Sequence, residues 1–65
     1  MLYLSQIIIA NREVESFDKL SELVSEYAQT GEMFFRMDVK PPYGDTPENW
    51  EDRLEAAFSG TPGRL

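Results

Sequence analysis

The residues of this chain that could do chemistry are carboxylates. Its 65 residues include 12 Asp and Glu but no His and no Cys. The commonest general base and the commonest thiol nucleophile are therefore missing, and a zinc site of the usual His/Cys kind is excluded. The sequence has no EF-hand loop and no glycine-rich phosphate loop. We expect a protein that is not an enzyme and that binds no metal and no cofactor.

Seven of the acidic residues form two rows at helical spacing. At about 100° per residue, each row falls within one arc of a helix. The first row is Asp18, Glu22 and Glu26, and the second is Glu48, Glu51, Asp52 and Glu55. Residues four apart lie about 6 Å apart along a helix axis, a spacing similar to that of phosphates along one nucleic-acid strand. The rows favour a surface that imitates a nucleic-acid backbone; the alternative is an ordinary solvated face.

The overall charge supports a basic partner. The formal net charge is −6, from 12 acidic and 6 basic residues. This balance argues against direct binding to nucleic acid, which needs Lys and Arg on phosphates, and is compatible with a basic protein surface. There is no apolar run long enough to cross a membrane and no signal-peptide pattern, so we expect a cytoplasmic protein and no membrane partner.

The clearest element is an amphipathic helix over 16–29. Ser16 is a good N-cap, and Gly31 can take the left-handed conformation that ends helices. The apolar residues of this segment share one face of the helix: Phe17, Leu20, Leu23, Val24, Tyr27 and Ala28. We expect the rest of the chain to pack on this face.

Two strands are expected on either side of that helix. The β-branched run Ile7–Ile9 favours a strand over 2–10, although both of its faces are largely apolar. Strict alternation over 32–40 predicts a second strand. Its inner face would hold Met33, Phe35, Met37 and Val39, with Phe34 on the polar face.

A second helix should follow the proline-containing break at 41–45. Thr46 is the expected N-cap, Pro47 the first helical residue, and the helix should end at Ser59–Gly60. Trp50, Leu54, Ala57 and Phe58 share its apolar face. Residues 61–65 are expected to form a flexible C-terminal tail.

The fold class is therefore α+β: one small domain over 1–60 with the order β-α-β-α. Strands joined through a helix would pair in parallel. Because a two-stranded sheet is not stable alone, we expect a third strand in 11–15, a helix on each face, or a homodimer that joins sheets. The apolar residues considered for a partner or dimer contact are Leu2, Leu4, Ile8, Phe34 and Tyr43.

Three functions fit these patterns. The first is an inhibitor that occupies a basic nucleic-acid-binding surface of another protein through the acidic rows. In size and charge the chain is similar to the small inhibitors that bacteriophages and mobile elements make against host machinery, such as anti-CRISPR and anti-restriction proteins, a similarity that transfers no residue. The second is an oligomerising or adaptor module that uses an apolar strand face. The third is an antitoxin-like neutraliser of a basic partner.

Overall fold

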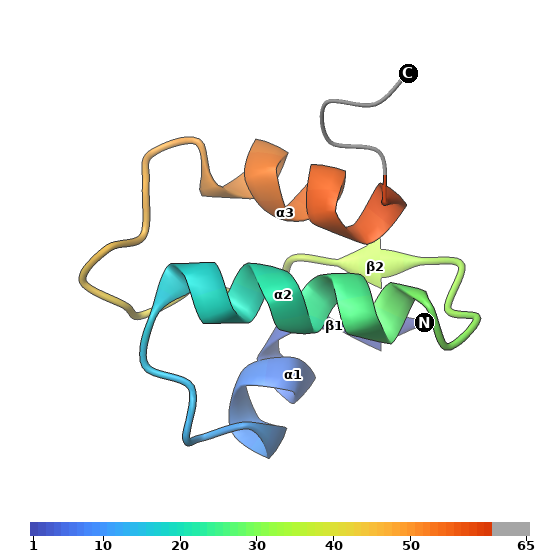
Figure 1. Ribbon diagram of the computed structural model, residues 1–65, viewed down its shortest axis with the longest axis horizontal. Coiled ribbons are helices and arrows are strands. Elements are labelled where there is room, and N and C mark those ends of the chain that lie inside the picture. Colours follow the sequence, from blue (N-terminus) through green and yellow to red (C-terminus); the bar gives the residue numbers. More distant parts are fainter. Residues whose placement is uncertain (61–65) are drawn as a thin grey trace.

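A computed structural model describes residues 1–60 of the 65, and the predicted tail at 61–65 lies outside them. The elements in chain order are β1 (Leu2–Tyr3), α1 (Leu4–Ala10), α2 (Phe17–Ala28), β2 (Phe35–Arg36) and α3 (Trp50–Ser59). In Figure 1, α2 crosses the middle of the molecule, with α3 on one side and α1 on the other. The architecture is mixed α/β, but its order is β-α-α-β-α and not the predicted β-α-β-α.

Helix α2 agrees with its prediction at both ends. The Ser16 hydroxyl oxygen accepts a hydrogen bond from the Lys19 backbone N–H at 3.2 Å, which satisfies one of the free donors of the first turn. Gly31 has φ 101°, a conformation that glycine adopts without a steric penalty. The helix buries Phe17, Leu20 and Val24.

The core is built around α2 and α3. The fully or nearly buried apolar residues are Leu2, Leu4, Ile7, Phe17, Leu20, Val24, Leu54 and Ala57. The Ser25 hydroxyl of α2 also donates to the Ala57 carbonyl of α3 at 2.9 Å, which holds the two helices in register. Phe35 of β2 stacks on Phe58 of α3, with ring centroids 5.1 Å apart.

The prediction of a strand over 2–10 is wrong beyond Tyr3. Residues 4–10 form α1, because Leu4, Ile7 and Ile8 also have the i, i+3, i+4 spacing of one helix face, and that face packs on the core. Ile9, which a buried strand would have covered, is 69% exposed. The segment 2–10 is largely apolar on both faces of the predicted strand, a pattern that is also compatible with a helix.

The second predicted strand is shorter than its alternation indicated. Only Phe35–Arg36 pairs with β1, in parallel as expected, with Leu2 opposite Phe35 and Tyr3 opposite Arg36. The ladder ends there because the chain becomes helical at Leu4 and offers no further partner. Met33 and Val39, predicted to face inward, are therefore exposed, whereas Phe35 and Met37 pack on the core.

Helix α3 begins three residues later than predicted, at Trp50 and not at Pro47. Thr46 is not its N-cap, because the Thr46 hydroxyl donates instead to the Pro41 carbonyl at 3.2 Å. Asn49 occupies the N-cap position, and Gly60, with φ 72°, ends the helix as expected. Trp50 and Phe58 pack against the core beside the buried Leu54, which confirms the predicted apolar face. Within residues 1–60 there is no third strand at 11–15.

Two aspartates from the connection between β2 and α3 hold the starts of α1 and α2. Asp38 accepts from the Ser5 backbone N–H at 3.1 Å and from the Ser5 hydroxyl at 2.7 Å. Asp45 accepts from the Phe17 backbone N–H at 2.8 Å. Carboxylates at helix N-termini satisfy free donors and interact favourably with the helix dipole. The irregular connection between β2 and α3 is thus hydrogen-bonded to the first turns of both α1 and α2.

Candidate protein-binding surface

An acidic hollow lies where the turn before α2 meets the outer side of that helix. Its volume is about 270 Å³. The residues that line it are Glu13, Val14, Glu15, Lys19, Glu22, Leu23 and Glu26. The turn contributes the first three, and α2 brings the other four to one side because they lie three or four residues apart along the helix. We call this feature the acidic hollow.

The hollow is strongly negative and has an apolar floor. Four carboxylates face one ammonium, and Lys19 Nζ lies 3.9 Å from Glu22 Oε1. Within residues 1–60, no cation forms an ion pair with Glu13, Glu15 or Glu26. Val14 and Leu23 are half-buried and pack against the core, so their exposed parts form the floor. The hollow therefore offers unpaired acceptors above a hydrophobic base.

The acids of the hollow lie apart from one another along the chain. No group of three or more acidic side chains within the described 60 residues is arranged to hold a metal ion. The carboxylates of the hollow are spread over a turn and two turns of α2. A protein surface that carries several Lys or Arg side chains matches this arrangement.

The structure brings together only part of the predicted acidic surface. All seven predicted acids are exposed. Glu22 and Glu26 line the hollow, while Asp18 lies one turn earlier on α2. The sequence-based prediction omitted Glu13 and Glu15, because a turn has no helical period to reveal them. Their only signal was their position just before an acidic helix.

The α3 acids lie on a different side of the molecule. A shallow groove of about 340 Å³ separates α2 from α3 and is lined by Ser21, Glu22, Ser25, Arg53, Ala56 and Ala57. Glu48, predicted in the same helical row, lies before the first residue of α3. At about 100° per residue, Glu51 and Glu55 project from the side of α3 opposite Arg53, whereas Asp52 lies between that side and Ala56. Arg53 itself lies over the Phe17 ring, 5.8 Å from its centroid, and places a positive charge between the two rows. The two rows do not form one continuous acidic face.

Most of the apolar candidates are not available for a partner. Leu2 and Leu4, considered for a partner or dimer contact, are buried in the chain's own core. Ile8 and Tyr43 are half-buried and pack against that core, and burial raises the pKa of the Tyr43 hydroxyl above its usual value. Phe34 differs from these residues, because it is 64% exposed.

Comparison with known proteins adds no functional assignment. No protein-family model, curated protein or solved structure matches this chain. Among the described helices, none is long and apolar enough to cross a membrane.

Proposed function

We propose that this protein is a non-enzymatic binding protein that occupies a basic, nucleic-acid-binding surface of another protein. The observation that carries the proposal is the acidic hollow, with four carboxylates, a single lysine and an apolar floor. Exposed carboxylates without cations attract a basic partner and accelerate its association. The net charge of −6 extends that attraction over the whole molecule.

The chemistry of the hollow suits Lys and Arg side chains. The aliphatic stems of these residues pack on apolar surface while their charged heads remain among polar groups. In the hollow, Val14 and Leu23 would contact the stems, and Glu13, Glu15, Glu22 and Glu26 would accept from the heads. Arg can bind a carboxylate through two parallel hydrogen bonds, which adds directional specificity.

The biological role that fits this chemistry is inhibition by competition. A protein bound to a basic groove excludes DNA or RNA sterically and neutralises the charges that hold the phosphates. Anti-CRISPR and anti-restriction inhibitors act on targets of this class. An antitoxin-like neutraliser would use the same surface and would differ only in its target.

The test is capture of partners from a bacterial lysate at about 0.05 M and about 0.5 M salt, followed by a competition assay with the partner's nucleic acid. Charged surface contacts weaken as the Debye length shortens. We expect a nucleic-acid-binding protein that is recovered at low salt only, and we expect an excess of this protein to displace its DNA or RNA.

Two matched variants locate the contact. Glu22→Gln with Glu26→Gln removes two charges from the hollow, and Glu51→Gln with Glu55→Gln removes two from the opposite side of α3. All four side chains are exposed, so the fold should be unaffected. Loss of two contacting carboxylates should weaken binding at least about tenfold, and loss of two remote ones much less. Equal effects would show that only net charge matters, and salt-independent capture would contradict the proposal.

A further inference from the structure

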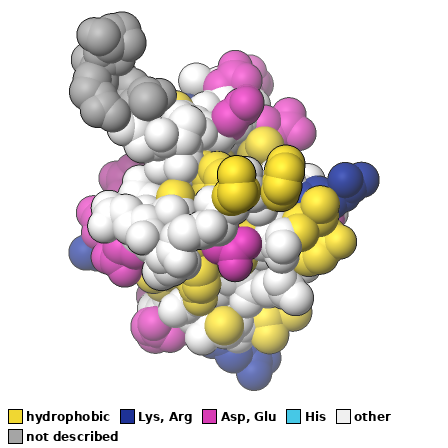
Figure 2. All heavy atoms as spheres, turned by 90° about the vertical axis from the view of Figure 1, so that its right-hand side faces the viewer, with side chains coloured by type: hydrophobic (Ala, Val, Ile, Leu, Met, Phe, Trp, Pro, Cys, Tyr) yellow, Lys and Arg dark blue, Asp and Glu magenta, His cyan; other side chains and the backbone are white. Residues whose placement is uncertain are grey.

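The outer face of the small sheet carries a second surface of a different kind. Four large apolar side chains are exposed on or beside the strands: Met1 at 65%, Tyr3 at 36%, Met33 at 80% and Phe34 at 64%. We call these four residues the sheet-face patch. The view in Figure 2 shows hydrophobic side chains gathered on this side of the molecule.

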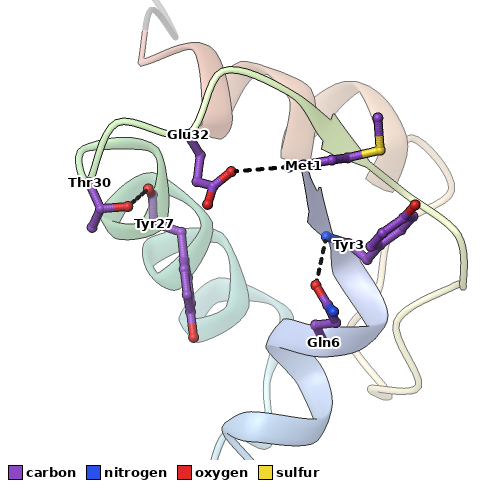
Figure 3. Close-up of polar contacts among 6 residues, drawn as sticks. All are labelled: Met1, Tyr3, Gln6, Tyr27, Thr30 and Glu32. Carbon is purple, nitrogen blue, oxygen red and sulfur yellow. Dashed lines mark hydrogen bonds and ion pairs between the residues drawn. The ribbon is translucent and has the colours of Figure 1, made fainter.

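The strand register explains why Met1, Tyr3 and Phe34 point outward together, and Met33 is exposed in the segment before β2. Leu2 and Phe35 are opposite each other and both contact the core. Because strand side chains alternate, the residues before and after them face the other way. Figure 3 shows the Met1 and Tyr3 side chains on the same side of β1, away from Glu32 and Tyr27. Phe34 directly precedes β2, and its side chain does not pack on the core. Its backbone carbonyl accepts a hydrogen bond from the Leu2 N–H at 2.9 Å.

The charges around the sheet-face patch balance. In residues 1–5 and 31–38 the positive groups are the N-terminal amine and Arg36, and the negative groups are Glu32 and Asp38. The N-terminal amine lies 3.8 Å from Glu32 Oε1. The other ten acids lie outside these segments. This face can therefore approach an identical face without the repulsion that the rest of the molecule would produce.

The size and charge pattern point to one occupant. We propose that a second copy of this chain docks on the sheet-face patch in a two-fold symmetric dimer. At about 200 Å² for each fully exposed side chain of this size, the patch presents roughly 500 Å² of apolar surface. A stable dimer buries about 800 Å² per partner, of which about 65% is apolar. The patch therefore supplies the apolar part of one half of such an interface.

A two-fold axis also pairs the charges at the rim. In a symmetric interface a residue of one copy meets a different residue of the other, and the reverse contact follows automatically. Arg36, which follows Phe35 in β2, can thus face a negative group of the second copy, and the contact occurs twice. Docking would also cover a two-stranded sheet that is marginal when left open. The acidic hollow remains on the outside of both copies, so the dimer and the proposed function are tested separately.

The experiment is sedimentation equilibrium of the purified protein over a wide concentration range. The wild type should reach twice the chain mass of 7.5 kDa. Phe34→Ser should raise the dissociation constant at least about tenfold, as expected for an aromatic residue at the centre of an interface. The matched control is Ile9→Ser, because Ile9 is 69% exposed but belongs to α1. It should dimerise like the wild type.

Three further measurements test whether a change in dimerisation comes from the interface and not from unfolding. Circular dichroism should show the same helix content for all variants, and Met33→Ser replaces Phe34→Ser if the latter unfolds. Raising salt should tighten the dimer slightly, because it screens the repulsion between two chains of net charge −6. A wild type that stays at 7.5 kDa at every concentration, or equal weakening by Phe34→Ser and Ile9→Ser, would overturn the proposal.

Discussion

Helix α2 and the connection from 29 to 49 are held in place by different means. The Ser16 side chain caps the first turn of the helix by accepting from the backbone N–H of Lys19, three residues on. The helix buries Phe17, Leu20 and Val24 along one side. The connection contains one strand of two residues. Asp38 and Asp45 accept hydrogen bonds that link it to Ser5 and Phe17, 33 and 28 positions away in the sequence. Packing along one continuous face orders the first region, whereas the second combines isolated packing contacts, such as those of Phe35 and Tyr43, with long-range polar contacts.

The largest predicted effect tests the packing of the first region. Leu20→Ala should lower the free energy of unfolding by about 2–5 kcal/mol, because Leu20 is fully buried and its loss leaves a cavity. A domain of this size has a total stability of about 3–10 kcal/mol, so much of the variant should be unfolded. Urea denaturation followed by circular dichroism measures the change. Val39→Ala, at an exposed position of the connection outside the sheet-face patch, should cost less than about 0.5 kcal/mol. A similar loss in the free energy of unfolding for both variants would contradict the difference between the helix and the connection.

A smaller effect is expected where the connection is fastened to α2. Asp45→Ala should lower the free energy of unfolding by about 0.5–2 kcal/mol, since Phe17 N–H loses its acceptor. Asp45→Asn keeps an acceptor oxygen and loses only the charge, so its cost should be smaller. The same urea titration compares the two variants. If Asp45→Asn is as destabilising as Asp45→Ala, the charge and not the hydrogen bond is responsible.

The smallest expected effect is a pH dependence of the free energy of unfolding, caused by the contact between Asp38 and Ser5. Hydrogen bonds from the Ser5 hydroxyl and backbone N–H hold the pKa of the Asp38 carboxyl below its ordinary value of 3.8. The folded-state pKa is thus the lower one. The stabilisation is fully present above the ordinary value and is lost as the pH falls through the folded-state pKa.

Unfolding measured from about pH 5 to about pH 2 tests this dependence. Asp38→Asn should flatten the fall in stability with acid. Glu51→Gln is the control, because the Glu51 carboxylate makes no hydrogen bond or ion pair within the described residues. A wild-type slope in Asp38→Asn would show that ionisation of Asp38 contributes nothing to the fall of stability in acid.

The parts of the fold that were predictable are those in which local signals agree. Helix α2 has a periodic apolar face, a serine cap and a terminal glycine, and α3 has the same kind of face and ends at Gly60. Residues 4–10 were misassigned because β-branched residues favour strands, whereas packing of Leu4 and Ile7 on the core decided for a helix. That one change also shortened β2, since a strand extends only as far as its partner.

The candidate site was predictable only where it lies on a helix. The helical period correctly placed Glu22 and Glu26 on the solvent side of α2. It could not show that Glu13 and Glu15 join them, because a turn brings residues together through the path of the chain. Nor could it show that α3 turns its acids away from α2, since that depends on how two helices pack.

Trp50 is the single tryptophan of the sequence, and it lies half-buried at the start of α3 against the core. Its indole emission therefore reports one place in the molecule, the docking of α3. Neither the acidic hollow nor the sheet-face patch includes this residue. Fluorescence can thus follow the integrity of the core while a partner or a second copy binds elsewhere, without an added dye or an engineered label.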